Sequence, residues 1–252
     1  MTSSSVRRTL AIDVGGTGLK ACLLDNAATI VGERVRIPTR YPMSPDSLVS
    51  NLVSLAGALP RFHRASVGFP GVVREGRVLT APHFVNKNGP DDAPNRKLTA
   101  AWRGFDLSGA LTGAFGVPVR IANDADLQGA AAVSGAGIEM VMTLGTGVGT
   151  GLFRDGRVAP HLELGHHPLE KGKTYDQRLG EGARRRVGTK KWQERVYSSI
   201  AVLDALVNFD HLYVGGGNAR RLELPLPERV TVVSNEDGLL GAVKLWDNRT
   251  FR

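Results

Sequence analysis

The chain has 252 residues, of which 42% are hydrophobic and 22% charged, with a formal net charge of +8. This is an ordinary globular composition, with enough chain for one large domain or two small lobes, and the single cysteine, Cys22, excludes an internal disulfide framework and a cysteine-rich zinc site. Because the first eight residues are polar and no apolar run approaches the roughly 20 residues of a membrane span, we expect a cytoplasmic protein with no membrane partner.

The N-terminal segment is predicted to alternate strands with a helix. Residues 8–37 read as three strands, the first two joined by a glycine-rich turn. Residues 44–59 are predicted to be helical because Ser44 can cap them, Pro45 suits the first turn and leucines recur on one face. A strand is expected at 65–69.

The middle of the chain opens with a segment, residues 82–104, that is rich in Pro, Asn, Asp and Gly and is predicted to be a loop with a functional role. A short helix at 106–115, with Asp as its cap and a glycine as its stop, a strand at 117–122 and a helix at 124–133 should follow it.

The C-terminal part repeats this plan. We expect strands at 138–144 and 150–154, a long amphipathic helix over 192–206, a short strand at 212–214 and a last helix at about 236–247.

The two halves of the chain are predicted to form two lobes. Each half opens with a glycine-rich strand–turn–strand unit and continues with strands and helices, which is typical of α/β lobes around a central cleft. We place the N-terminal lobe at residues 1–122 and the C-terminal lobe at 123–252, with the last helix packing back on the N-terminal lobe.

The first glycine-rich turn lies within residues 13–20. Its glycines would let backbone N–H groups approach a phosphate, Thr17 can add a hydroxyl and Lys20 a cation. Asp13 stands where it could hold Mg²⁺ through water. A plain glycine-rich hairpin explains this segment about as well.

Two more glycine-rich turns follow. The segment 144–151 holds four glycines, more than one hairpin needs, which favours close approach of a ligand. Gly215–Gly217 ends a strand and leads into an expected helix whose N-terminus would suit an anion. No turn matches the Walker loop or the dinucleotide fingerprint, which disfavours P-loop NTPases and NAD enzymes.

Asn123 and Asp124 follow an apolar strand at the start of a helix. Strand ends face the ligand crevice in α/β lobes, so Asp124 could take a hydroxyl proton during phosphoryl transfer while Asn123 binds a neighbouring hydroxyl. Helix capping is the commoner role of such residues, and the pair taken alone favours it.

The segment Glu163–His166 places a carboxylate and an imidazole three residues apart, where both can bind adjacent sugar hydroxyls. A metal site using His161, Glu163, His166 and His167 is the alternative, which the nearby prolines and glycine disfavour because they interrupt a regular helix.

Taken in order, these segments resemble the ROK family of sugar kinases and repressors over nearly the whole chain. The resemblance implies an actin/hexokinase-like (ribonuclease H-like) fold with two lobes, and transfer of a phosphoryl group to the 6-hydroxyl of a sugar with Mg²⁺. Phe69-Pro70-Gly71 resembles the family's substrate loop, and Glu163–His166 its E-x-G-H sugar motif.

The resemblance also implies residue roles. Asp124 would be the catalytic base and Asp13 the metal ligand. The implied sugar ligands are Gly71, Asn123, Asp124, Glu163, His166 and Glu181. The implied phosphate ligands are Gly15, Gly16, Thr17, Gly18, Lys20, Gly145, Thr146, Gly147, Gly215, Gly216 and Gly217.

The chain departs from the usual family pattern. Residues 167–181 lack the cysteines of the family's zinc segment, so we expect no zinc, with Glu181 in place of that segment's glutamate. The sequence G-G-T-G-L-K at 15–20 resembles the polyphosphate glucokinase branch. The short stretch between Glu181 and Gly215 leaves little material to enclose an adenine.

A basic run near the end of the sugar-binding half could serve as a track for a phosphate chain, although a solvated helix face is the alternative for each residue. We expect no nucleic-acid partner, because no helix-turn-helix fits before the first strand. The run comprises Arg184, Arg185, Arg186, Lys190 and Lys191, with Lys171, Lys173, Arg220 and Arg221 nearby.

The expected protein is therefore a glucokinase that uses polyphosphate, with ATP as a second donor, and acts on glucose, with mannose as a second sugar. We expect it to form a homodimer, as relatives often do. Two alternatives stay open: an ATP-dependent hexose or N-acetylhexosamine kinase, and a non-catalytic sugar-sensing regulator on the same fold.

Overall fold

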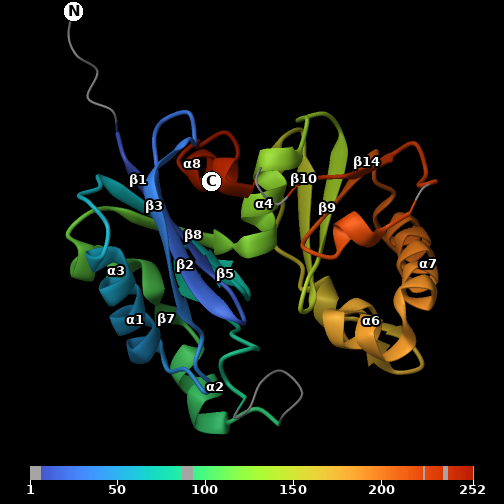
Figure 1. The fold of residues 1–252 in the computed structure, drawn as a ribbon, viewed down its shortest axis with the longest axis horizontal. Helices are drawn as coiled ribbons and strands as arrows, with labels where there is room; N and C mark the ends of the chain where they lie inside the picture. The colour runs from blue at the N-terminus through green and yellow to red at the C-terminus, as the bar shows by residue number, and fades with distance from the viewer. Residues whose placement is uncertain (1–6, 87–92, 224, 235–237, 252) are drawn as a thin grey trace, which may run out of the picture. The chain divides into compact units, whose positions relative to one another are not determined.

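The computed structural model describes residues 7–86, 93–223, 225–234 and 238–251 (Figure 1). They form two compact units. Unit 1 comprises the described residues up to Leu127 together with Ala242–Asn248, and unit 2 comprises Gln128–Gly241 and the described residues from Arg249. The chain passes from unit 1 to unit 2 within helix α4, Asp124–Ala132. The predicted lobe boundary after residue 122 stays a prediction.

Unit 1 is built on a five-stranded sheet in the order β3-β2-β1-β4-β8. The first three strands run antiparallel as consecutive hairpins, whereas β4 and β8 run parallel to β1. The strands are β1 (Thr9–Val14), β2 (Gly18–Leu24), β3 (Ile30–Pro38), β4 (Arg64–Phe69) and β8 (Val119–Asn123).

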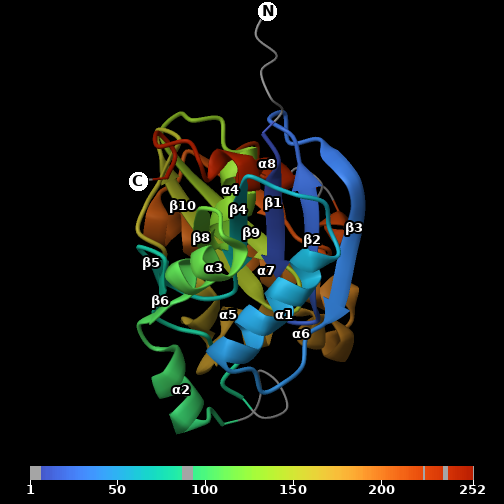
Figure 2. The same cartoon turned by 90° about the vertical axis from the view of Figure 1, so that its left-hand side faces the viewer.

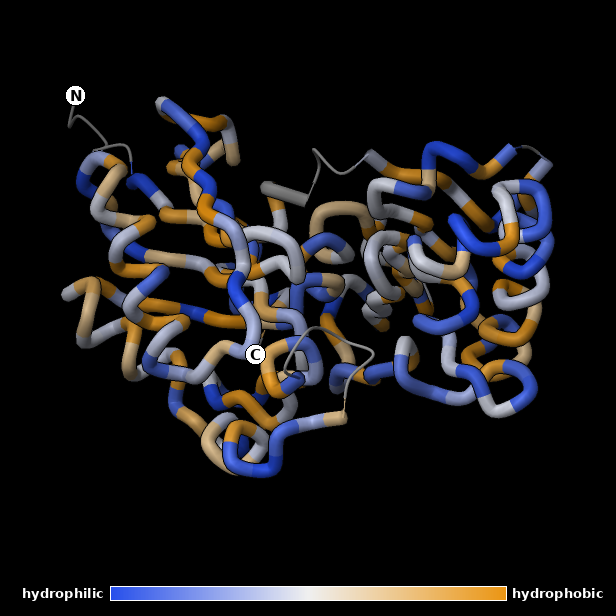
Figure 3. Tube along the Cα trace, turned by 60° about the horizontal axis from the view of Figure 1, so that its bottom comes forward, coloured by the Kyte–Doolittle hydropathy of each residue, from blue (hydrophilic) through white to orange (hydrophobic). Residues whose placement is uncertain are grey.

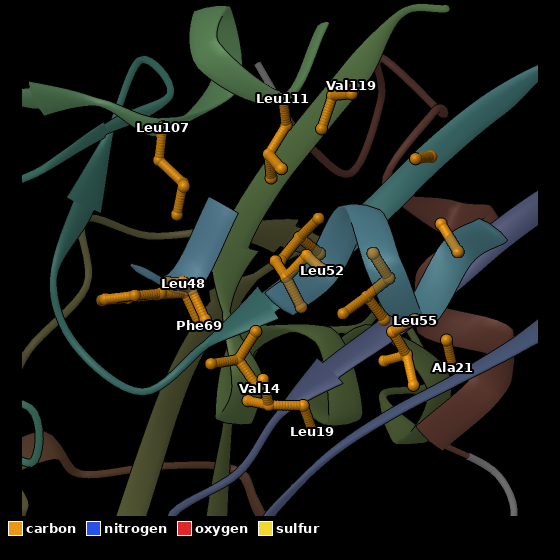
Figure 4. Packing of buried hydrophobic residues seen from close by; sticks show 14 of the residues in the cluster. Val14, Leu19, Ala21, Leu48, Leu52, Leu55, Phe69, Leu107, Leu111 and Val119 are labelled. Carbon is orange, nitrogen blue, oxygen red and sulfur yellow. The ribbon is translucent and has the colours of Figure 1, made fainter. Parts of the chain in front are cut away.

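Helix α1 (Pro45–Gly57) forms as the sequence predicts. The Ser44 hydroxyl accepts a hydrogen bond from Ser47 N, and the leucines at every third or fourth position are buried. Helix α1 packs against α3 (Leu107–Phe115) on one face of the sheet (Figure 2). Figure 4 shows Leu52 and Leu55 of α1 against Val14 and Leu19 of the sheet. Truncating one such leucine to alanine typically costs about 2–5 kcal/mol.

Helix α3 also confirms its predicted signals, since Asp106 caps it and Gly116 ends it in the left-handed conformation with φ +67°. The predicted loop at 82–104 is wrong in part. Its described residues include helix α2 (Arg96–Trp102), which Asn95 caps by accepting from Lys97 N and Leu98 N. The Trp102 side chain is buried. Residues 87–92 lie outside the described residues.

Unit 2 repeats the sheet plan of unit 1. Its order is β11-β10-β9-β14-β15, with antiparallel hairpins on one side of β9 and parallel strands on the other. The similarity of the two predicted halves is thus confirmed at the level of the sheets. The strands are β9 (Ile138–Leu144), β10 (Val148–Arg154), β11 (Arg157–Val158), β14 (His211–Gly215) and β15 (Val230–Val232).

The core of unit 2 lies between this sheet and its helices. The long helix α7 (Thr189–Val207) buries Trp192, Val196, Ile200 and Leu203, the stripe that its periodicity predicts. Helices α5 (Tyr175–Leu179) and α6 (Glu181–Val187) precede it and contact it. In Figure 3 the chain changes between hydrophobic and hydrophilic every few residues, as expected where each element buries one face.

A late segment of the chain completes unit 1. It includes the end of helix α8 (Gly238–Lys244). The Ser66 hydroxyl donates to Ala242 O at 2.6 Å and accepts from Trp246 Nε1 at 2.8 Å. The Trp246 ring lies beneath the guanidinium groups of Arg64 and Arg120, at 5.0 and 4.7 Å from its centroid.

The remaining elements are short strands and 3₁₀ turns outside the two five-stranded sheets and the helices already described. No helix among the described residues is both long and apolar enough to cross a membrane. The remaining elements are β5 (Val73–Arg74), β6 (Arg77–Val78), β7 (Phe105–Asp106), β12 (Pro168–Glu170), β13 (Lys173–Thr174) and two 3₁₀ turns, η1 (Leu164–His166) and η2 (Ala219–Arg221).

Candidate active site

Unit 1 gathers its predicted site residues at one edge of its sheet. Strands β1, β4 and β8 run parallel, and their register pairs Asp13 with Gly68 and Phe69 with Asn123. Since the carboxyl ends of parallel strands meet at the same edge, Asp13, the Phe69-Pro70-Gly71 loop and Asn123 all lie there. Asp124 begins helix α4 directly after this edge.

The first glycine-rich turn is held in place through its carbonyl groups. Gly15 N donates to Gly18 O at 3.1 Å, which closes the turn. The Thr39 hydroxyl donates to Gly15 O at 2.6 Å, and the Tyr41 hydroxyl donates to Gly16 O at 2.5 Å. These hydrogen bonds restrict the conformation of the turn.

Asp13 and Lys20 face each other across β1 and β2. Their side chains form an ion pair with Nζ 2.9 Å from Oδ2, and about half of each side chain is exposed. The Arg36 guanidinium lies beside the same turn, 3.4 Å from Thr17 O. The predicted metal ligand and the predicted phosphate cation are therefore brought together, with a second cation close by.

Asn123 caps helix α4 and also binds the loop at Gly71. It is 5% exposed, its Oδ1 accepts from Ala125 N at 2.8 Å at the start of α4, and its Nδ2 donates to Gly71 O at 3.1 Å. Asn123 therefore caps helix α4, which is one of the two roles considered for it from the sequence. The same amide also holds the Phe69-Pro70-Gly71 loop through Gly71 O. Asp124 Oδ1 accepts from Ala125 N at 2.9 Å, and its side chain is part-buried.

In unit 2 the second glycine-rich turn is packed against the protein itself. Asp176 on α5 accepts from Val148 N at 2.6 Å through Oδ1. A Cβ at Gly147 would lie 2.9 Å from the same carboxylate oxygen. The contact with Asp176 is therefore a structural reason for a glycine at Gly147. Its role in binding a phosphate stays a prediction. A Cβ at Gly145 would have no neighbour within 4 Å, so there is room for a ligand on that side of the residue.

The third glycine turn packs on the second. Gly216 has φ +89°, and a Cβ there would overlap the backbone of Leu144. Asn218 N donates to Leu144 O at 2.9 Å and its Nδ2 donates to Gly145 O at 3.3 Å. The predicted helix after this turn is wrong, because only the three-residue 3₁₀ turn η2 follows, which offers no helix N-terminus to an anion.

The E-x-G-H segment lies on the 3₁₀ turn η1, so no regular α-helix spaces its side chains. Glu163 lies between two imidazoles, 3.7 Å from His161 Nε2 and 3.9 Å from His166 Nε2. His166 Nδ1 lies 3.8 Å from Asp176 Oδ2. Within the described ranges no three His, Cys, Asp or Glu side chains are placed to hold a metal ion.

Glu181 occupies the first turn of α6, and its carboxylate is bound by two arginines. Arg184 donates to it at 2.7 and 2.8 Å, and Arg185 at 2.7 Å, which together lower the pKa of Glu181 to about 2. Its backbone N–H donates to Gly145 O at 3.0 Å. Glu181 therefore links α6 to the second turn, and two members of the basic run, Arg184 and Arg185, pair with it. A role of this run as a track for a phosphate chain stays a prediction.

Known proteins resemble this chain over most of its length. A sequence model of the ROK family matches residues 9–203. The chain belongs to the ROK family. The polyphosphate glucokinase of Mycobacterium tuberculosis strain H37Rv is 27% identical over 259 residues, which cover 95% of this chain and 91% of that protein.

Solved structures of sugar kinases share the fold. The inorganic polyphosphate/ATP-glucomannokinase from Arthrobacter sp. strain KM superimposes with a TM-score of 0.78 at 28% identity, covering 94% of this chain and 97% of that one. A ROK family glucokinase from Streptomyces griseus, solved with glucose and AMPPNP, gives 0.73 at 18% identity, covering 96% and 99%. The expected actin/hexokinase-like α/β fold is confirmed.

Three residues at these sites are missed by the sequence reasoning. Thr39 and Tyr41 follow the end of β3 and contact a turn more than twenty positions away, and Asp176 contacts a turn that precedes it by 28 positions. The sequence around Asp176 does not distinguish it from an ordinary acidic residue in the first turn of a helix. The only available signal was its position on a short helix soon after the E-x-G-H segment.

Proposed function

We propose that this ROK-family chain is a glucokinase that transfers a phosphoryl group from inorganic polyphosphate, and also from ATP, to the 6-hydroxyl of glucose. The observation that carries the proposal is the edge of the unit 1 sheet, where Asp13, the Gly71 loop, Asn123 and Asp124 lie at or just after the carboxyl ends of three neighbouring strands. Relatives that bear the names polyphosphate glucokinase and polyphosphate/ATP-glucomannokinase span nearly the whole chain and support it.

In this proposal Asp124 is the general base. Its carboxylate takes the proton of the 6-hydroxyl as the oxygen attacks the terminal phosphorus of the donor. Asn123 holds the loop at Gly71 and offers the second hydrogen of Nδ2 to a sugar hydroxyl. Glu163 and His166 bind further sugar hydroxyls, so positioning and charge neutralisation supply most of the rate enhancement.

The phosphate chain of the donor would contact the glycine turns. In the first turn Thr39 and Tyr41 bind carbonyl oxygens and Gly15 N donates to Gly18 O. The N–H groups of Gly16 and Thr17 and the Thr17 hydroxyl would then contact the phosphate. Lys20 and Arg36 supply positive charge beside it. The open space at Gly145 suits a phosphate in the second turn.

A magnesium ion fits this donor set only together with the donor. Asp13 is half-exposed and contributes one carboxylate, and Mg²⁺ is usually bound through one or two carboxylates plus phosphate oxygens and water. Asp13 would hold the ion, which when bound neutralises charge on the phosphates. Asp13 would then pair with the ion in place of Lys20, and the Lys20 ammonium would be available to the phosphate.

The donor is tested by initial rates with glucose. We expect turnover with polyphosphate that exceeds turnover with ATP, because a net charge of +8 and the exposed cations beside the turns favour a polyanion. The KM for polyphosphate should also rise more steeply with salt than the KM for ATP, since more charges are neutralised. Good activity with ATP and none with polyphosphate would reject the donor but not the kinase. Binding of sugar without turnover on either donor would favour a sugar-sensing regulator.

The hydrogen bonds to the carbonyls of Gly15 and Gly16 predict an effect on the KM for the phosphoryl donor and not on the KM for glucose. Replacing Tyr41 with phenylalanine removes the hydroxyl that binds Gly16 O, and replacing Thr39 with valine removes the one that binds Gly15 O. We expect each change to raise the KM for the phosphoryl donor about 5- to 10-fold, the value of one hydrogen bond, while the KM for glucose stays within about twofold.

A matched control for these variants is Tyr197→Phe. Tyr197 on α7 also donates its hydroxyl to a backbone carbonyl, that of Glu223, in a part of unit 2 outside the site. This control should leave the KM of both substrates unchanged. Equal donor KM values for Tyr41→Phe and the control would show that the hydrogen bond from Tyr41 to Gly16 O has no role in donor binding.

A further inference from the structure

The side chain of Asp176 connects two segments that the proposed function uses separately. Its Oδ1 accepts from Val148 N in the second glycine turn at 2.6 Å, and its Oδ2 lies 3.8 Å from His166 Nδ1 in the sugar segment. The carboxylate is mostly buried, with 21% of the side chain exposed. One buried carboxylate thus touches both the turn and the imidazole.

The surrounding glycines show that this contact is built into the fold. A Cβ at Gly165 would lie 2.9 Å from Asp176 Oδ1 and overlap the carbonyl oxygen of Val148. A Cβ at Gly147 would lie equally close to Oδ1, and one at Gly180 would crowd the Asp176 carbonyl. The glycine of E-x-G-H and one glycine of the second turn therefore make room for Asp176.

The helix that carries Asp176 is fixed at its start. Thr174 accepts from Gln177 N, and the Gln177 side chain accepts from Thr174 N, which forms a capping box. The neighbouring Tyr175 and Leu179 are buried in the core of unit 2. The capping box and the core of unit 2 thus help to set the position of Asp176.

His166 has a carboxylate on each side of its ring. Nδ1 faces Asp176, and Nε2 faces Glu163 at 3.9 Å. Burial raises the pKa of Asp176, and the nearby Glu163 adds to this, while the Val148 N–H and His166 act in the opposite direction. The proton on one ring nitrogen decides what the other nitrogen offers to a ligand.

We infer that Asp176 is a positioning residue that keeps the proton of His166 on Nδ1 and fixes the ring, so that Nε2 is presented on the side of Glu163 to a sugar hydroxyl. The 3.8 Å separation shortens to a hydrogen bond when a sugar binds, as contacts in unliganded sites commonly do. Through Val148 the same carboxylate ties the sugar segment to the turn proposed to bind phosphate. The catalytic part of this inference rests on the proposed function.

Asp176→Asn separates the two contacts of the carboxylate. The amide oxygen can still accept from Val148 N, but the amide nitrogen then faces His166 Nδ1 and favours the tautomer with the proton on Nε2. We expect the KM for glucose to rise about tenfold with the donor KM unchanged. Asp176→Ala removes both contacts, and it should raise the KM of both substrates.

The direct readout is the tautomer of His166, observed by long-range ¹H–¹⁵N correlation of the imidazole with a His166→Gln spectrum for assignment. The unmodified chain should show the proton on Nδ1 and Asp176→Asn should show it on Nε2. This measurement needs no turnover, so it judges the inference even if glucose is not the substrate. An unchanged tautomer in Asp176→Asn would overturn it.

A matched control is Asp210→Asn. Asp210 also accepts from a backbone N–H, that of Ile138 at 2.7 Å, at the opposite end of β9 from the second turn. It should change neither KM nor the tautomer. The Asp176→Asn effect on glucose should also vanish in a His166→Ala background, because Asp176 acts through that ring. A tenfold effect that persists there would show that Asp176 acts by another route.

Discussion

Replacing Asp124 with alanine is expected to lower kcat by about 10²- to 10⁴-fold, the usual contribution of a general base, while glucose still binds. Asp124 follows the edge of the unit 1 sheet where Asn123 and the Gly71 loop are joined by a hydrogen bond. Removing its carboxylate leaves that hydrogen bond in place. Initial rates at saturating substrates give kcat, and calorimetric titration of glucose gives the dissociation constant.

A second variant separates base catalysis from helix capping. Asp124→Asn keeps an oxygen to accept from Ala125 N but cannot take a proton at neutral pH, so it should lose nearly as much kcat as the alanine variant. Asp106→Asn is the matched control, since Asp106 Oδ1 accepts from Gly109 N at the start of α3, away from the site. Near-normal kcat in Asp124→Asn would reject Asp124 as the base.

Replacing Glu139 with glutamine is expected to lower the free energy of unfolding by about 3 kcal/mol. Glu139 is fully buried in β9, and its carboxylate accepts from Ser134 N and Oγ, Gly135 N, Ala136 N and the Tyr213 hydroxyl at 2.7–3.2 Å. An amide nitrogen in place of either oxygen meets at least one backbone N–H and leaves it without an acceptor. Urea unfolding near neutral pH measures the difference.

The pH dependence of this difference has a definite sign. Burial of Glu139 opposes its ionisation, but the hydrogen bonds from Ser134, Gly135 and Tyr213 outweigh it, so the pKa in the folded chain lies below the ordinary value. The stabilisation is therefore complete above the unfolded pKa of about 4.3 and is lost as the pH falls through the folded pKa. The variant and the unmodified chain should converge in stability at acidic pH.

Tyr213→Phe is the matched control for Glu139. It removes one donor from the same carboxylate and should cost about 1 kcal/mol. If Glu139→Gln cost no more than Tyr213→Phe at neutral pH, the carboxylate would not be what holds residues 134–136 together.

The sequence was sufficient where structure is set by neighbours in the chain. Helix α1 is capped by Ser44, and helix α3 begins at its cap Asp106 and ends at Gly116, all as predicted. Helix α2 was missed because its signal is only seven residues long and its cap, Asn95, belongs to a stretch whose composition is typical of a loop.

The site could be predicted only in part. The sequence shows the order of the motifs along the chain, but it does not show the contacts between residues far apart in it. The edge with Asp13, Asn123 and Asp124 follows from strand ends, although the residue roles remain predictions. The hydroxyl of Tyr41 on Gly16 and the carboxylate of Asp176 on Val148 join distant segments that no local pattern links. The resemblance assigns Gly216 to a phosphate, which stays a prediction, and its contact with the Leu144 backbone requires glycine whether or not a ligand binds.

The late segment that completes unit 1 bears on how the chain folds during synthesis. Ser66, Arg64 and Arg120 are made early, but their partners Ala242 and Trp246 are made more than a hundred residues later. Domains usually fold as they leave the ribosome, N-terminal part first. Here the packing of the first unit is completed by residues 242–248, so we expect its final step to follow the synthesis of the second unit.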